Sequence, residues 1–203
     1  EMPLRLVGSE MCIRDRFLGG GSNILLCGDY KGLVIHIALK GIANLGNGML
    51  KAQAGENWHE FVMWTLNNGY NGIENLSLIP GNVGAAPMQN IGAYGVELKD
   101  VFVELEAFHI QSEEIHVFDN TTCEFGYRES VFKAKHKGEY VILSVTLQLS
   151  KEGLLNTTYG AIQEVLNNRQ IANPSPKDVS DAVIYIRQSK LPDPKKIGNS
   201  GSF

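Results

Sequence analysis

Two glycine-rich stretches contain the residue types of this sequence that are best suited to binding a ligand. The first is Leu18-Gly19-Gly20-Gly21-Ser22-Asn23. Successive glycines let backbone N–H groups converge on an anion, and the serine and asparagine can add side-chain hydrogen bonds. A phosphate or pyrophosphate would suit this stretch, although its spacing matches neither the dinucleotide fingerprint nor the P-loop. A flexible turn without a ligand is the alternative interpretation.

The second stretch consists of two loops of small residues separated by a few positions. It reads Ile79-Pro80-Gly81-Asn82-Val83-Gly84-Ala85-Ala86-Pro87 and then Asn90-Ile91-Gly92-Ala93-Tyr94-Gly95. Such loops can enclose a flat ring system through backbone contacts, and their apolar, uncharged composition suits an isoalloxazine better than a sugar. A long loop inside a compact domain is typically functional, but a packed structural loop is the alternative.

Composition narrows the class of protein around these loops. The chain has 203 residues, a formal net charge of −4, 43% hydrophobic residues and 20% charged residues. This composition is typical of a globular protein with one large or two small domains. The mild acidity argues against binding to nucleic acid or to anionic membranes. Three cysteines, Cys12, Cys27 and Cys123, cannot all pair within the chain, which favours a reducing, cytoplasmic compartment.

Hydrophobic periodicity predicts the elements that must position the loops. The apolar run at 33–39 predicts a buried strand, and alternating or apolar runs predict further strands over 49–55, 101–110, 113–119 and 140–150. Helical spacing predicts a helix over 57–68 that begins at Asn57, and the pattern Ser175-Pro176-Lys177-Asp178 predicts the start of another. Because helices and strands do not alternate regularly, the fold class is expected to be α+β. His36 is expected to be a core residue, and His59 lies on the first helix beside Glu60.

The order of several motifs resembles a known enzyme family. The stretches are LGGGSNILL, AGENWHEFV, ENLSLIPGNVGAAPMQNIGAYGVEL, CEFGYRESVFK, TTYG, KLPDP and GNSGSF. Together they resemble the UDP-N-acetylenolpyruvoylglucosamine reductases, flavoenzymes of peptidoglycan precursor synthesis. The tyrosine of TTYG resembles the subtype whose tyrosine loop closes over the substrate.

The resemblance implies an FAD-binding α+β fold of the vanillyl-alcohol oxidase type, with two FAD subdomains and a third over the substrate. Residues 18–45 would be the remainder of the first subdomain, 46–190 the second, and 191–203 the start of the third. Residues 1–17 are expected to be a non-native or divergent start, because they resemble a translated adapter. The implied FAD-binding residues are Gly19, Gly20, Gly21, Ser22, Asn23, Ile79, Pro80, Gly81, Gly84, Ala85, Ala86, Gly92 and Ala93.

The resemblance also implies catalytic and substrate-binding residues. Arg128 would stabilise the enolate that forms when hydride reaches the enolpyruvyl group, since a guanidinium can bind the developing charge bidentately. Ser202 would donate the proton that completes the reduction. A surface ion pair with Glu124 or Glu129 and a bystander loop serine are the alternatives for these two residues. The implied substrate-binding residues are Tyr94, Arg128, Tyr159, Arg187 and Lys190.

The implied activity is NADPH-dependent reduction of UDP-N-acetylglucosamine-enolpyruvate by an FAD enzyme that is expected to be monomeric. No metal site is expected, because no His, Cys, Asp and Glu grouping has zinc or calcium spacing. The family's second catalytic acid, a glutamate, is expected to lie beyond the end of this sequence. Two alternatives are another FAD-dependent oxidase or dehydrogenase of the same fold, and a non-catalytic nucleotide-binding fragment.

Overall fold

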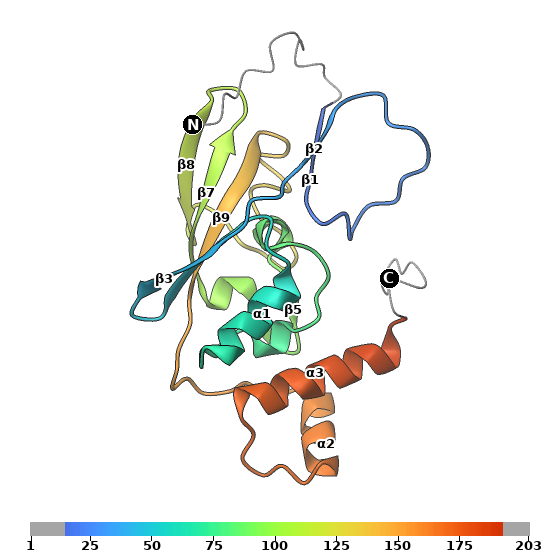
Figure 1. Ribbon diagram of the computed structural model, residues 1–203, viewed down its shortest axis with the longest axis vertical. Helices are drawn as coiled ribbons and strands as arrows, with labels where there is room; N and C mark the ends of the chain where they lie inside the picture. The colour runs from blue at the N-terminus through green and yellow to red at the C-terminus, as the bar shows by residue number, and fades with distance from the viewer. Residues whose placement is uncertain (1–14, 193–203) are drawn as a thin grey trace.

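A computed structural model describes residues 15–192 of the chain. Its centre is a five-stranded antiparallel sheet with the strand order β3-β4-β9-β7-β8. Helix α1 and a group of short helical turns lie beside this sheet, and α3 and α2 follow on the far side of α1 (Figure 1). The strands of the central sheet are β3 (Ile42–Gly46), β4 (Met49–Gln53), β7 (Phe102–His109), β8 (Glu114–Asp119) and β9 (Tyr140–Gln148).

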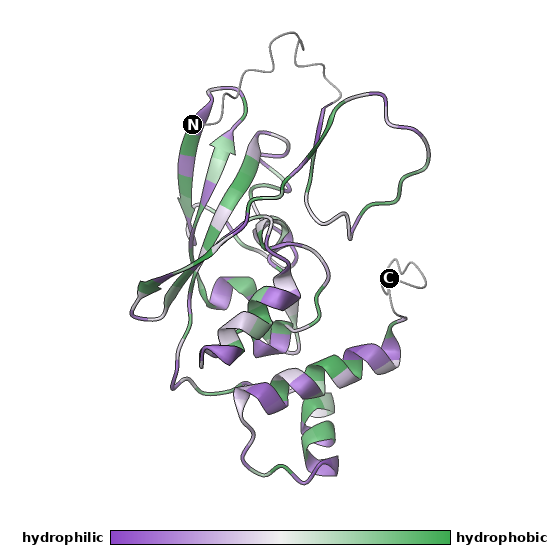
Figure 2. Cartoon of the chain, viewed as in Figure 1, coloured by the Kyte–Doolittle hydropathy of each residue, from purple (hydrophilic) through white to green (hydrophobic). Residues whose placement is uncertain are grey.

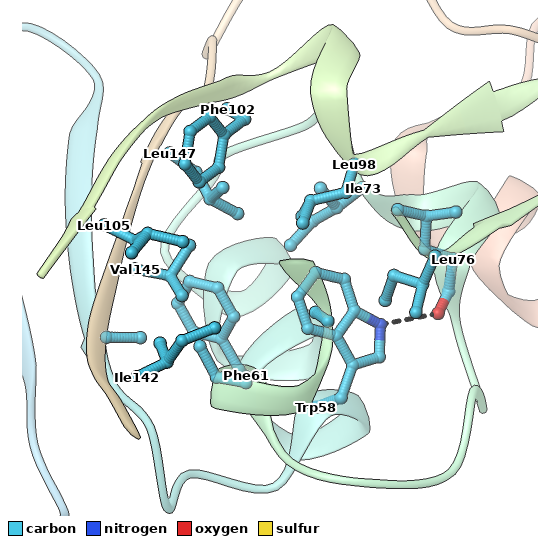
Figure 3. Packing of buried hydrophobic residues seen from close by; sticks show 14 of the residues in the cluster. Trp58, Phe61, Ile73, Leu76, Leu98, Phe102, Leu105, Ile142, Val145 and Leu147 are labelled. Atoms are coloured by element: carbon cyan, nitrogen blue, oxygen red, sulfur yellow. Dashed lines mark hydrogen bonds between the residues drawn. The ribbon is translucent and has the colours of Figure 1, made fainter. Parts of the chain in front are cut away.

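Helix α1 (Trp58–Asn67) supplies the side chains that complete the main core. Asn57 caps it by accepting a hydrogen bond from the Glu60 backbone N–H, as the sequence predicts. Phe61 points from α1 toward Val145 of the sheet, Trp58 lies toward Leu76, and all four side chains are buried (Figure 3). Burial of each large apolar side chain stabilises the fold by about 1.5–3 kcal/mol.

Helices α2 (Gly160–Asn168) and α3 (Pro176–Lys190) form a smaller second core. Ser175 and Asp178 form a reciprocal capping box at the start of α3, with Pro176 at its first position, which confirms the prediction. Both helices carry hydrophobic and hydrophilic residues in Figure 2. Their shared apolar cluster consists of Ile162, Leu166, Val179, Ala182, Val183 and Ile186.

The long glycine-rich stretch contains more regular structure than its composition predicts. Three short 3-10 helices, η1 (Glu74–Leu76), η2 (Val83–Ala85) and η3 (Pro87–Gln89), are followed by the small hairpin β5 (Gly92–Ala93) and β6 (Val96–Glu97) and by η4 (Leu98–Asp100). Backbone hydrogen bonds along each turn explain how a segment without hydrophobic periodicity becomes ordered.

The prediction of a buried strand over 33–39 is wrong in burial and in length. The structure has a three-residue strand, β2 (Val34–His36), which pairs in parallel with β1 (Arg16–Leu18) in a separate two-stranded sheet. Val34 is 46% exposed, and His36 is exposed as well, so His36 is not a core residue. Apolar composition indicated burial, but no helix or second sheet covers this strand among residues 15–192. Within the same residues, no helix is both long and apolar enough to cross a membrane.

Candidate functional site

The two glycine-rich stretches meet at one cavity of about 230 Å³. Ser22 and Asn23 come to it from the loop after β1, and the loop between η1 and η3 contributes residues on another side. The predicted ligand-binding residues that line it are Ser22, Asn23, Ile79, Pro80, Ala85 and Ala86. The structure therefore brings together two sequence stretches that are about 60 residues apart in the chain.

Glycines lie where these two loops touch, and there a side chain would crowd the opposite loop. A Cβ on Gly20 would lie 2.8 Å from Asn82 Oδ1, and a Cβ on Gly81 would lie 3.0 Å from Ser22 Oγ. Gly81 also has a φ of +114°, a conformation that side chains disfavour. Because glycines stand at these positions, the side chains of Ser22 and Asn82 lie close together, where both can contact one ligand.

Helix α1 fixes the second loop in place. The Trp58 backbone N–H donates to the Gly81 carbonyl at 3.0 Å, and Val83 N–H donates to the Glu56 carbonyl at 2.8 Å. The Trp58 indole N–H donates to the Leu76 carbonyl at 2.9 Å (Figure 3), while the same side chain lines the cavity. The cavity wall is therefore continuous with the main core, which gives the site a rigid support.

Arg128 lies in a tight turn whose backbone brings its side chain against β5. Its Nη1 donates to the Asn90 carbonyl at 3.3 Å, and its Nη2 donates to the Gly92 carbonyl. A Cβ on Gly92 would lie 2.8 Å from Arg128 Nη1 and 3.0 Å from the Val96 carbonyl oxygen, so a side chain here would displace the guanidinium from its present position. Two of the five N–H donors are thus used for positioning, and three are left for a ligand. No carboxylate of residues 15–192 forms an ion pair with Arg128, in contrast to the alternative that paired it with Glu124 or Glu129.

Asn90 is the centre of the hydrogen-bond network that holds the Arg128 turn. Its Nδ2 donates to the Gly126 carbonyl at 3.0 Å and to Glu97 Oε2 at 3.2 Å. Its Oδ1 accepts the Lys99 backbone N–H at 3.0 Å, and the residue is fully buried with a φ of +40°. Asparagine tolerates this left-handed conformation better than most residues, which explains its presence in the loop.

Lys133 connects the Arg128 turn to the cavity. Its Nζ donates to the Arg128 carbonyl at 3.0 Å, and its side chain lines the cavity together with Ser22 and Asn23. Arg128 has a φ of +55°, so the lysine stabilises a backbone conformation that is otherwise disfavoured. The cationic turn and the cavity are therefore parts of one site.

A second cluster joins Tyr94, Tyr159 and Arg187. The two tyrosine rings pack edge to face with centroids 5.2 Å apart, and Arg187 interacts with the Tyr94 hydroxyl. Burial raises the pKa of Tyr94, and the nearby Arg187 charge opposes that shift. Burial also lowers the pKa of Arg187, which has no ion pair to a carboxylate among residues 15–192. A cation of this kind is suited to binding an anionic ligand.

The other predicted site residues are placed less centrally. Gly84 packs against Ala54, the residue that follows β4, since a Cβ there would lie 2.5 Å from the Ala54 Cβ, and Gly84 does not line the cavity. Gly19 and Gly21 border open space, and Ala93 belongs to β5 next to Gly92. Lys190 is the exposed last residue of α3. Ser202 lies outside the residues that the structure describes.

Sequence reasoning did not assign a role to several residues of the site. The cavity is also lined by Trp58, Asn82, Met88, Gln89, Ile91 and Lys133. Asn82 could have been found, because it stands inside the second glycine-rich stretch and carries an amide beside Gly81. Lys133 gives no such signal, because its contact with Arg128 depends on the fold of the turn. In the described part of the chain, no three His, Cys, Asp or Glu side chains gather in a way that could hold a metal ion.

Comparison with known families identifies a ligand class for the chain. The family described as "FAD binding domain" matches residues 10–118, which is more than half of the chain and includes both glycine-rich stretches. The chain belongs to the FAD-binding domain family. This membership confirms the α+β, FAD-binding fold that the sequence predicts.

Several relatives of this FAD-binding chain are named as reductases. It is 54% identical over 191 residues to a UDP-N-acetylenolpyruvoylglucosamine reductase of Flavobacterium johnsoniae, covering 92% of this chain and 57% of the relative. It is 55% identical over 190 residues to the reductase of Amoebophilus asiaticus, covering 92% and 56%. The predicted resemblance is confirmed, and the chain spans slightly more than half the length of these relatives.

A solved structure supports the fold of this FAD-binding chain. The crystal structure of the UDP-N-acetylenolpyruvylglucosamine reductase from Thermus caldophilus superposes with a TM-score of 0.53 at 20% identity. The match covers 88% of this chain and 82% of that chain. At this identity the similarity concerns the fold alone.

The residues at the cavity fit the flavin part of FAD. Ile79, Pro80 and Ala86 provide an apolar wall for a flat ring, while the Asn82 and Gln89 amides are suited to its polar edge. The cavity of about 230 Å³ is smaller than the roughly 300–1,000 Å³ of a typical complete ligand site, so it accounts for part of the cofactor. The glycine contacts between the two loops would let backbone N–H groups approach a phosphate.

Proposed function

We propose that this chain is part of a flavoenzyme that uses NADPH to reduce the enolpyruvyl group of UDP-N-acetylglucosamine-enolpyruvate to UDP-N-acetylmuramate in peptidoglycan precursor synthesis. The observation that carries the proposal is the connection between Arg128 and the cavity through Lys133, which donates to the Arg128 carbonyl and lines the cavity. The identity of more than 50% to reductases of this name supports it.

Arg128 is proposed to bind the carboxylate of the substrate. FAD supplies hydride transfer when it is bound. The guanidinium binds the carboxylate more strongly as negative charge develops on it, so the contact favours the transition state over the ground state. The two carbonyls of Asn90 and Gly92 hold the guanidinium in a fixed orientation, which reduces the entropy lost when the substrate binds.

The remaining roles follow the same proposal. Tyr94, Tyr159, Arg187 and Lys190 would bind the UDP part, with Arg187 neutralising the diphosphate. Ser202 would donate the proton to the substrate carbon. Residues 18–45 would be the remainder of the first FAD subdomain, residues 46–190 the second, and residues 191–203 the start of the third. The protein is proposed to act as a cytoplasmic monomer.

A two-step experiment tests the proposal. The purified chain is titrated with FAD, and UDP-N-acetylglucosamine-enolpyruvate is then added while the flavin absorbance is recorded. We expect saturable FAD binding, a spectral change with the substrate, and loss of that second change in Arg128→Met. In a chain extended to the length of its relatives, substrate-dependent oxidation of NADPH should require Arg128. FAD binding without any substrate response in the extended chain would instead support a non-catalytic nucleotide-binding protein.

A further inference from the structure

A line of hydrogen bonds joins His59 on α1 to Arg187 on α3 through a single backbone residue. The Leu78 N–H donates to His59 Nδ1 at 3.1 Å. The Leu78 carbonyl accepts from Arg187 Nε at 3.2 Å. Both polar backbone groups of Leu78 are therefore satisfied by side chains of two different helices.

Leu78 needs these bonds, because its backbone conformation is disfavoured. It has a φ of +58°, which costs a residue with a side chain about 1–2 kcal/mol relative to the right-handed region. Ile79, the next residue, lines the cavity. The conformation of Leu78 therefore determines how the cavity wall and the Arg187 guanidinium are placed relative to each other.

The hydrogen bond to Leu78 requires a neutral imidazole at His59. Nδ1 can accept an N–H only when it carries a lone pair, so the ring proton must be on Nε2. Burial is the main cause that lowers the pKa of His59; Lys177 on α3 lowers it further and Glu60 on α1 opposes it. Lys177 is itself paired with Asp181, and the segment 77–80 presents no ionisable side chain.

We propose that His59 is a positioning residue whose neutral imidazole holds Leu78 in its left-handed conformation and thereby orients Arg187 to bind the diphosphate of a nucleotide sugar. This inference rests on the proposed function for the identity of the anion. Protonation of His59 turns Nδ1 into a donor that faces the Leu78 N–H, so the link breaks and Arg187 loses the carbonyl that orients it. Affinity for the anion should therefore fall as the pH falls through the pKa of His59, below the ordinary value of 6.5.

The test measures the affinity of the FAD-loaded chain for UDP-N-acetylglucosamine by calorimetry between pH 5 and pH 8. This probe is a diphosphate diester, so it lacks the secondary phosphate ionisation near pH 6 that would confuse the result. In the wild type we expect Kd to rise about tenfold toward pH 5, comparable to losing one hydrogen bond. His59→Asn keeps an acceptor near the position of Nδ1 and does not titrate, so it should retain tight binding at pH 7.5 and show no rise. His59→Ala should bind weakly at every pH.

Two controls separate this inference from the proposed function. His36→Asn removes an exposed histidine on β2 and should keep the wild-type pH profile. The second is the NMR signal of the Arg187 Nε–H, which needs no ligand and should shift with the titration of His59 in the wild type but not in His59→Asn. If UDP-N-acetylglucosamine fails to bind but this signal follows His59, the proposed anion is wrong and the positioning role stands. The same pH dependence in His59→Asn as in the wild type, or a His59 ring protonated on Nδ1 at neutral pH, would overturn the inference.

Discussion

Replacement of Asn90 by alanine should destabilise the protein by about 3 kcal/mol. The substitution removes the acceptor of the Lys99 N–H and the donor to the Gly126 carbonyl. The Lys99 N–H and the Gly126 carbonyl, which would lose their partner, are only part-buried. The lower end of the penalty for an unsatisfied polar group therefore applies, about 1 kcal/mol for each. Alanine at a φ of +40° adds about 1 kcal/mol. Glu97 keeps its ion pair with Lys99 at 2.9 Å and adds little.

Urea unfolding followed by the fluorescence of Trp58 and Trp64 measures this change as a shift of the midpoint at constant slope. Asn90→Gly also loses the side-chain hydrogen bonds, but glycine adopts the positive φ without strain. It should therefore be about 1 kcal/mol more stable than Asn90→Ala. Asn167→Ala changes an exposed asparagine on α2 and should stay within about 0.5 kcal/mol of the wild type. If Asn90→Ala also stays within 1 kcal/mol, Asn90 does not hold the Arg128 turn and the reasoning about this network is wrong.

Four further outcomes are expected. Gly81→Ala should weaken FAD binding about tenfold in a fluorescence titration, because its φ of +114° and the contact with Ser22 Oγ both resist a side chain; Gly28→Ala, which borders open space, should not. Ser175→Ala should lower the free energy of unfolding by about 1 kcal/mol. Hydrogen bonds from Ser175 lower the pKa of the Asp178 carboxyl below its ordinary value of 3.8. The ionised carboxylate therefore stabilises the folded protein at pH values above 3.8, and this contribution is lost as the pH falls further. The stability difference between the wild type and Asp178→Asn should accordingly vanish as the pH falls below 3.8. Burial raises the pKa of the Cys123 thiol to about 12, so a thiol reagent at pH 8 should modify Cys27 and leave Cys123 unmodified until the chain unfolds, as a Cys12→Ser background would show.

The sequence predicted helices and strands that are determined by residues close together in the chain. The capping box at Ser175 and Asp178 predicts the start of α3, because the residues that satisfy its first N–H groups are adjacent in sequence. Helix α2 escaped prediction because its first residue follows Tyr159, which makes no side-chain cap. Strand β3 escaped because most of its residues are exposed and show no alternation.

The glycine-rich loops of the candidate site could be predicted from the sequence, but the long-range side-chain contacts that hold the site together could not. Glycine-rich spacing and the family resemblance indicated both loops, and the structure places them at one cavity. The contacts of Arg128 with Asn90 and Gly92 join residues that are 38 and 36 positions apart, so only the folded chain brings them together. The contact between His59 and Leu78 depends on a positive φ at a leucine, for which sequence gives no signal.

The strand order of the central sheet has a consequence for synthesis of the chain on the ribosome. Strand β4 lies between β3 and β9, and its residue Met49 pairs with Gln148, which is made much later. At roughly 5–20 residues per second, β4 must wait on the order of 5–20 s for this partner. During that interval Leu50 and Ala52, which are fully buried in the finished protein, are exposed along an open strand edge. The nascent chain is therefore most vulnerable to aggregation before β9 emerges, and a chaperone that binds extended apolar segments would act in that period.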